Sequence, residues 1–137
     1  MGSPSGAEAR LARMSPRLRK LAPVIDAACI VVFVALGRDR HDIDQGFDWW
    51  FTVLWPLFVG WFAVALAVRL YTQRAGRWTA LLVTLAAGIV VASLFRGTFT
   101  DRPYAGIFTI VAVAFIGLTT FGWRAVAGLV AGRRATT

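Results

Sequence analysis

Three long apolar runs without a charged residue constrain this chain more than any other feature. Trp49 to Val68, Trp78 to Phe95 and Pro103 to Trp123 contain no Asp, Glu, Lys or Arg. A helix of about 20 apolar residues spans the roughly 30 Å hydrocarbon core of a bilayer. The whole chain is 58% hydrophobic and 16% charged, whereas a soluble domain is about 25% charged. Each run therefore predicts a transmembrane helix.

A fourth span precedes these three, but its apolar run is shorter and contains Asp26. It reaches full length if the helix covers residues 18–37 and the basic side chains at its start extend to the headgroups. The alternative is a secretory signal peptide cleaved near Ala35 to Gly37. We favour a retained span, because a carboxylate inside the apolar run is atypical of a signal peptide.

The predicted fold is all-α, an integral membrane bundle of four antiparallel helices joined by short connections. The expected spans are residues 18–37, 48–70, 78–96 and 103–124, within a domain of residues 18–126. Residues 1–17 are expected to form a disordered basic tail, and residues 127–137 a basic C-terminal tail.

Basic residues are concentrated on one side of the predicted bundle. Eleven of the fifteen lie in the N-terminal segment, the second connection and the C-terminus: Arg10, Arg13, Arg17, Arg19, Lys20, Arg69, Arg74, Arg77, Arg124, Arg133 and Arg134. Because basic residues near span ends stay in the cytoplasm, we expect a multi-pass protein of the cytoplasmic membrane with both termini inside (N-in/C-in). This distribution explains the net charge of +8 without nucleic acid, and it favours contact with anionic inner-leaflet lipids.

The second and third spans carry residues that shape helix packing. Pro56 is expected to kink the second span, with Gly60 one turn further on. The third span has small residues at four-residue spacing, Ala80, Thr84, Gly88 and Ala92, which would let another helix approach closely. Arg96 is the next position in this row, so it should point into the bundle rather than into lipid.

Asp26 is the sharpest single signal, because a carboxylate at a bilayer centre costs about 2.5–3.5 kcal/mol on insertion scales. One interpretation is a proton or cation site. The other is a structural ion pair facing the bundle, with Arg69 or Arg124 as partner at similar depth. We favour the structural interpretation.

A second polar group is expected at the outer span ends, where Arg38, His41 and Arg96 come together near several aspartates. His41 could act as a proton relay or pH sensor, but we favour a solvated polar loop as the explanation of these residues. One histidine with scattered aspartates matches no zinc-ligand pattern. We therefore expect no metal site, and we find no sequence motif for a cofactor or a catalytic nucleophile.

The order of several short motifs resembles a family. These are Asp26, "GRDRH" with Gly37, Arg38 and His41, "WPLFVGW" with Pro56, Gly60 and Trp61, "LFRG" with Arg96, and "FGWRA" with Trp123 and Arg124. The series is similar to a bacterial family of small four-span membrane proteins of unknown function, well represented in actinobacteria. The resemblance covers about residues 23–125. It implies a membrane location and four helices, and it supplies no activity.

Three classes of function stay open on this reading. We favour a structural or accessory membrane protein, either a homo-oligomer or a component of a larger complex. The second is a small transporter or channel that moves protons or cations through Asp26. The third is a lipid-binding protein or enzyme that uses Arg38, His41 and Arg96 at the outer headgroup level, but the absence of a nucleophile motif argues against enzyme chemistry.

Overall fold

The computed structural model describes residues 6, 9, 14–40, 46–72, 77–100, 106–134 and 136, and only the backbone of residues 38–40 and 49. Within these ranges it contains four long helices and no strand. They are α2 (Pro16–Arg40), α3 (Phe47–Ala67), α4 (Arg77–Phe99) and α5 (Ile107–Arg134). All four are long and apolar enough to cross a membrane. The predicted all-α, four-span bundle is therefore confirmed.

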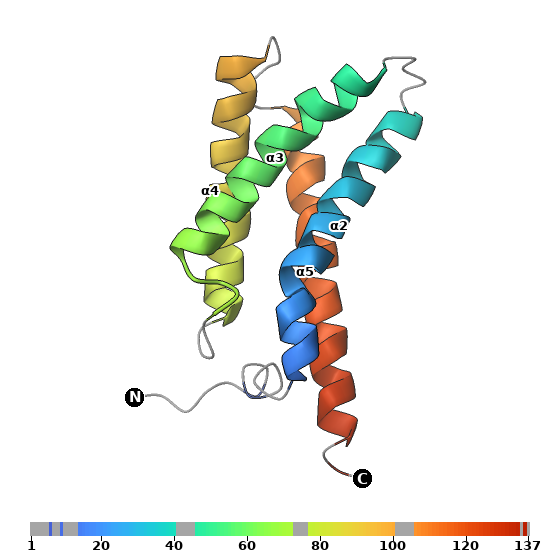
Figure 1. Ribbon diagram of the computed structural model, residues 1–137, viewed down its shortest axis with the longest axis vertical. Helices are drawn as coiled ribbons and strands as arrows, with labels where there is room; N and C mark the ends of the chain where they lie inside the picture. The colour runs from blue at the N-terminus through green and yellow to red at the C-terminus, as the bar shows by residue number, and fades with distance from the viewer. Residues whose placement is uncertain are drawn as a thin grey trace.

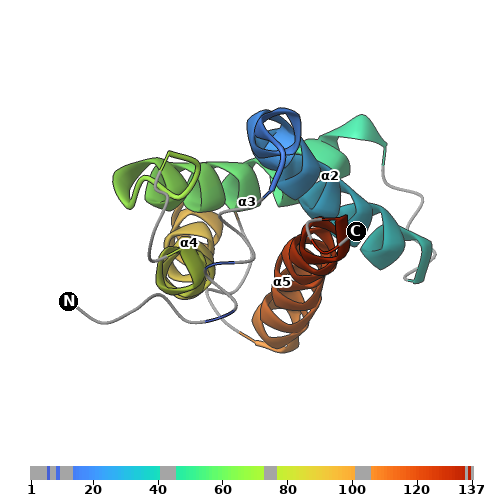
Figure 2. The ribbon, with the colours of Figure 1, turned by 90° about the horizontal axis from the view of Figure 1, so that it is seen from below.

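The helices alternate in direction along the chain, so α2 and α4 run one way and α3 and α5 the other (Figure 1). Helix α2 packs on α3 and α5, and α4 packs on α3 and α5, which closes a ring around one core. Seen end-on, α2 and α3 lie on one side and α4 and α5 on the other (Figure 2). The start of α2 and the end of α5 lie at the same end of the bundle (Figure 1).

This end, which we call the basic end, also contains the end of α3 and the start of α4. Its described basic residues at the helix ends are Arg17, Arg19, Lys20, Arg69, Arg77, Arg133 and Arg134. The start of α2 is capped there, since the Ser15 hydroxyl accepts a hydrogen bond from the Leu18 amide at 3.3 Å. Pro16 occupies the first turn, where no amide is needed.

The end of α3 is a tight turn that reverses the chain. The Leu70 amide donates to the Ala65 carbonyl at 2.8 Å, and the Arg69 amide donates to the Leu66 carbonyl at 3.1 Å. These two bonds form a Schellman motif, which requires a left-handed residue at Arg69, where φ is 54°. Helix α3 therefore ends at Ala67, three residues before the expected limit of residue 70.

Helix α5 differs from its expected range at both ends. It begins at Ile107 among the described residues, and the expected start at residue 103 lies outside them. It continues to Arg134, ten residues beyond the expected limit of residue 124. No proline interrupts this extension, and Arg133 and Arg134 in the last turn favour the negative end of the helix dipole. Residues 127–134 thus continue α5.

The closest helix contact joins α3 and α4 through small residues. A Cβ added to Gly60 of α3 would meet the Gly88 carbonyl oxygen and come within 2.7 Å of the Ala92 nitrogen. Ala80, Thr84, Gly88 and Ala92 are all buried on α4. The small-residue row expected to accept another helix is therefore filled by α3 of the same chain. Without bulky side chains between them, the two backbones approach closely.

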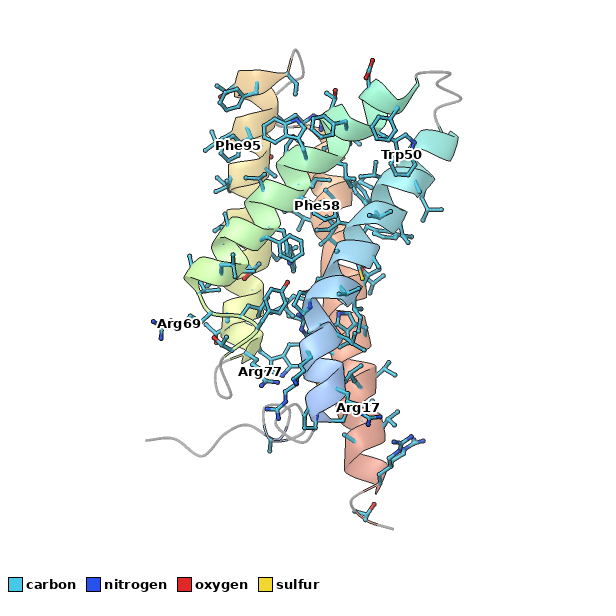
Figure 3. The ribbon with its side chains drawn as sticks, viewed as in Figure 1. Arg17, Trp50, Phe58, Arg69, Arg77 and Phe95 are labelled. Atoms are coloured by element: carbon cyan, nitrogen blue, oxygen red, sulfur yellow. The ribbon has the colours of Figure 1, made fainter. Side chains whose placement is uncertain are left out.

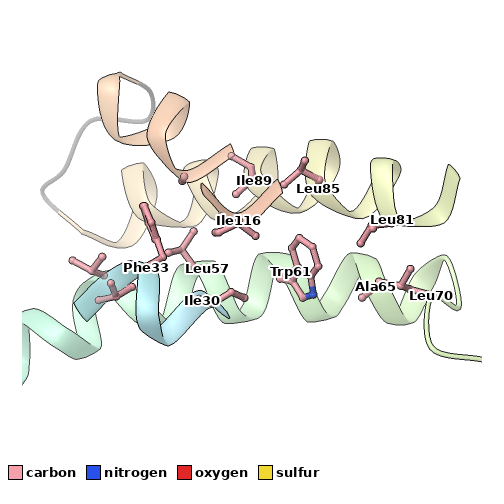
Figure 4. Close-up of a cluster of buried hydrophobic side chains, with 14 of the residues drawn as sticks. Ile30, Phe33, Leu57, Trp61, Ala65, Leu70, Leu81, Leu85, Ile89 and Ile116 are labelled. Carbon is pink, nitrogen blue, oxygen red and sulfur yellow. The ribbon is translucent and has the colours of Figure 1, made fainter. Parts of the chain in front are cut away.

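Trp61 is the largest fully buried side chain and the centre of the apolar core. Figure 4 shows its ring between the ribbons of α3 and α4. Ile30 of α2 and Ile116 of α5, both at most 1% exposed, complete the packing from the other two helices. The core thus involves all four helices, and Trp61 places one indole N–H inside it. That N–H needs a hydrogen-bond acceptor inside the core.

Candidate functional site

Asp26 lies in α2, ten residues from its start, and its side chain is completely buried. At 1.5 Å per residue this places it about 15 Å along the helix. Both of its oxygens are bound by Arg124 of α5. Arg124 Nη1 lies 2.7 Å from Oδ1, and Nη2 lies 2.7 Å from Oδ2. The pair is therefore a parallel, two-point ion pair, which is the strongest arrangement available to these groups.

Two aromatic donors bind the same carboxylate. The Trp123 indole nitrogen donates to Oδ1 at 3.0 Å, and the Tyr71 hydroxyl donates to Oδ2 at 2.9 Å. Each oxygen thus accepts two hydrogen bonds. A carboxylate offers about four lone-pair positions, so the acceptor capacity of Asp26 is filled.

The network continues into the core through Tyr71. Its hydroxyl oxygen accepts a hydrogen bond from the Trp61 indole nitrogen at 3.0 Å and donates its own proton to Asp26. This bond supplies the acceptor that the buried Trp61 requires. The network therefore joins α2, α3, α5 and the segment that follows α3 around one buried negative charge.

Tyr71 must keep its proton for this arrangement to hold. Burial raises the pKa of Tyr71 well above its ordinary value, and the negative charge of Asp26 raises it further. The hydrogen bond from Trp61 acts in the opposite direction but is a smaller effect. Tyr71 is therefore a neutral donor over the physiological range, and no second negative charge forms beside Asp26.

Arg124 is itself almost completely buried, with 6% of its surface exposed. Its Nη1 also donates to the Thr120 carbonyl at 3.2 Å, and its guanidinium carbon lies 4.5 Å from the centroid of the Trp123 ring. A cavity of about 20 Å³ lies beside it, lined in part by Arg19, Tyr71 and Arg77. This volume accommodates about one water molecule.

The two arginines considered as partners for Asp26 lie in different surroundings. Arg124 makes the ion pair, whereas Arg69 is exposed and its side chain points away from the bundle (Figure 3). The Schellman turn explains the difference, because it places Arg69 at the left-handed position outside the helix and folds Leu70 back into the core. Tyr71, two residues further on, then faces Asp26.

The aromatic donors were not identified as site residues from the sequence. Tyr71 and Trp123 look like ordinary interfacial aromatics, since such rings collect at membrane surfaces. Their predicted depth in the membrane could have identified them. A Tyr and a Trp at the level of a buried carboxylate each carry one hydrogen-bond donor that needs an acceptor. Trp61 gave a weaker signal, because its place in the core depends on how closely α3 and α4 approach.

The outer polar group is described only in part. His41 lies outside the described residues, and only the backbone of Arg38 is described. Arg96 is half-buried on α4, and its guanidinium carbon lies 3.8 Å from the centroid of the Phe108 ring of α5. A cavity of about 10 Å³ adjoins it and reaches Pro56, which is fully buried in α3. The Arg96 side chain therefore reaches from α4 to α5.

The described residues contain no group of three or more His, Cys, Asp and Glu side chains placed to hold a metal ion. Asp42 and Asp44 fall outside the described residues.

The whole Asp26 network falls within a stretch that matches a known protein family. Residues 23–127 match the family described as "Protein of unknown function (DUF3054)". The chain belongs to this family. The matched stretch contains Asp26, Trp61, Tyr71, Trp123 and Arg124, and it ends before the last turns of α5. No curated protein and no solved structure matches the chain.

Membership in DUF3054 agrees with the resemblance noted in the sequence, an uncharacterised family of small four-span membrane proteins. The description assigns no reaction, ligand or partner to the family.

Proposed function

We propose that this DUF3054 protein is a structural or accessory component of a cell membrane, and that Asp26 holds its helices together. The observation that carries the proposal is the saturation of Asp26. The side chain is fully buried, and four donors from Arg124, Trp123 and Tyr71 occupy its two oxygens. A carboxylate in this state offers no free position to a transported ion.

The surroundings of the carboxylate also disfavour cation transport. The small cavity beside the ion pair is lined in part by three arginines, Arg19, Arg77 and Arg124. A cation approaching Asp26 from this side would meet positive charge first. Protonation of Asp26 would leave Arg124 as an unpaired charge in the bundle, which is strongly unfavourable for a buried ion pair. Both arguments support a structural role over a proton or cation site.

Flux measurements test this proposal directly. The purified protein would be reconstituted into liposomes that contain a dye sensitive to protons, sodium or potassium, and a gradient of the matching ion would be applied to each. We expect the wild type to show the leak rate of empty liposomes. The proposal is wrong if the wild type conducts and Asp26→Asn abolishes conduction while circular dichroism shows that the variant is folded at the assay temperature.

We further propose that both termini face the cytoplasm, with α2 to α5 as the four spans of the cytoplasmic membrane. The concentration of basic residues at one end of the bundle supports this orientation. Cys29 is the single cysteine, so Cys29→Ser provides a background for labelling. A membrane-impermeant maleimide should label Gly46→Cys on intact cells and Thr136→Cys only after lysis. The reverse pattern would invert the topology.

An accessory role also implies a partner, either copies of this chain or a larger membrane complex. Exposed apolar side chains such as Leu66, Leu118 and Val126, each at least 60% exposed, provide surface for lipid or for another helix. Native mass spectrometry from mild detergent should show a species above the 14.9 kDa of one chain. A monomer with no bound subunit would contradict this part of the proposal.

A further inference from the structure

A second polar feature lies at the basic end, on the surface rather than in the core. It is an open groove of about 370 Å³ between the first turns of α2 and three residues from the end of the α3 turn and the start of α4. Arg19 and Lys20 line one wall, and Tyr71, Thr72 and Arg77 line the other. We call it the basic groove. Three cationic side chains and an exposed hydroxyl thus converge on one space.

Within the described structure, nearby carboxylates do not balance the charges of Arg19 and Lys20 in the basic groove. Asp26 is the one described carboxylate in this half of the bundle, and Arg124 binds both of its oxygens. Two helices, α2 and α4, begin at the groove without an acidic residue in the first turn. Each helix start adds a partial positive charge. The groove therefore favours an anion.

The position of the groove relative to the spans indicates which anion. The apolar spans of α2 and α4 begin at Pro16 and Arg77, and both residues line the groove. The groove is thus at the depth where lipid headgroups lie. Val24, one turn along α2 from Lys20, is 63% exposed and continues the same side of the helix as apolar surface. A phosphate in the groove would have acyl chains beside such surface.

We propose that the basic groove binds the phosphate headgroup of an anionic phospholipid. Arg19 can donate paired hydrogen bonds to phosphate oxygens and Lys20 supplies a point charge. The groove adjoins the Asp26 network, because Arg19, Tyr71 and Arg77 line both the groove and the small cavity beside Arg124. Arg19 and Lys20 lie before residue 23, where the family match begins. Lipid binding is therefore a proposal about this chain, not about DUF3054 as a whole.

The test is a lipid titration of the delipidated full-length protein in detergent, followed by native mass spectrometry at about 0.15 M salt. The probes are dioleoyl phosphatidylglycerol, which is anionic, and dioleoyl phosphatidylcholine, which is zwitterionic. We expect the protein to bind one molecule of phosphatidylglycerol in preference to phosphatidylcholine. Arg19→Gln combined with Lys20→Gln should weaken this binding about 25-fold, because each basic residue near a membrane surface contributes about fivefold.

The matched control is Arg69→Gln combined with Arg133→Gln. This control also removes two positive charges, but from exposed positions at the basic end that lie outside the groove. At this salt the Debye length is about 8 Å, so we expect less than a threefold loss. Equal losses in the two double variants would show diffuse attraction and overturn the proposal. The absence of a preference for phosphatidylglycerol over phosphatidylcholine would also overturn it.

A competition measurement and a folding control complete the test. Inorganic phosphate and glycerol 3-phosphate, at millimolar concentration, should not displace the lipid; displacement would assign the groove to a soluble phosphate compound instead. The thermal midpoint of each variant shows whether it is folded. If the double groove variant is unfolded, the exposed Lys20→Gln alone should still weaken phosphatidylglycerol about fivefold, and an unchanged affinity would contradict the site.

Discussion

For the Asp26–Arg124 pair we predict a double-mutant cycle in which the two single substitutions lower the free energy of unfolding by different amounts. Removing one partner of a buried ion pair costs about 3–5 kcal/mol, because the remaining charge is left without its counter-ion. Surface screening does not reduce this range here, since the two side chains are 0% and 7% exposed. We therefore expect each single substitution to lower the free energy of unfolding by at least about 3 kcal/mol.

The surroundings of each charge decide which substitution is worse. In Asp26→Asn, the remaining Arg124 keeps the Thr120 carbonyl and borders a cavity that accommodates a water molecule. In Arg124→Gln, the remaining carboxylate stays fully buried with the two neutral donors Trp123 and Tyr71. We expect about 3 kcal/mol for the first and about 4–5 kcal/mol for the second. The double variant should cost less than the sum by about 2–3 kcal/mol.

Equilibrium unfolding in mixed detergent micelles, followed by tryptophan fluorescence and far-ultraviolet circular dichroism, measures all four proteins of the cycle. Coincident transitions with the two probes would justify a two-state treatment. Additive losses, or single losses below about 1 kcal/mol, would refute the argument. Either result would mean that Asp26 and Arg124 do not stabilise the bundle through each other.

The helix contact and the Tyr71 hydroxyl give two more predictions. Gly60→Ala should lower the free energy of unfolding by about 1–3 kcal/mol, because its Cβ would overlap the α4 backbone at Gly88 and Ala92. Gly122→Ala is the matched control, since its Cβ would meet nothing within 4 Å, and an equal loss there would contradict the packing argument. Stability of the wild type should also fall as the pH rises above 10.0, the ordinary pKa of tyrosine. Above that pH the folded chain holds a proton on Tyr71 that the unfolded chain loses. Denaturant titrations from pH 8 to 11 should therefore show a smaller decline in the free energy of unfolding for Tyr71→Phe than for the wild type. Parallel declines in the two proteins would contradict this role of the Tyr71 hydroxyl.

The architecture followed from the sequence because it depends on one-dimensional properties. A bilayer requires about 20 consecutive apolar residues per helix, and three charge-free runs plus a weaker fourth satisfy that requirement. The small residues at four-residue spacing on α4 indicated a close helix contact in the same way. Their partner, the α3 helix at Gly60, was not determined by spacing, because any helix with a small residue at that depth would fit.

The cost of burying a carboxylate also follows from the sequence, so Asp26 could be recognised as a residue that needs a partner. The choice of partner could not. Arg69 and Arg124 have the same charge and similar predicted depth, and only the left-handed turn at Arg69 directs that side chain outward. The same turn brings the hydroxyl of Tyr71 to the carboxylate.

The amino-acid sequence by itself determined that this chain forms four membrane helices and that Asp26 must be compensated within them. Only the tertiary structure decided that Arg124, Trp123 and Tyr71 provide the compensation, and that Arg19, Lys20 and Arg77 border one groove. The physical reason is that apolar length and the cost of a buried charge are properties of single segments. Hydrogen bonds and shared cavities instead depend on the direction of each side chain, which is set by a turn or a helix crossing.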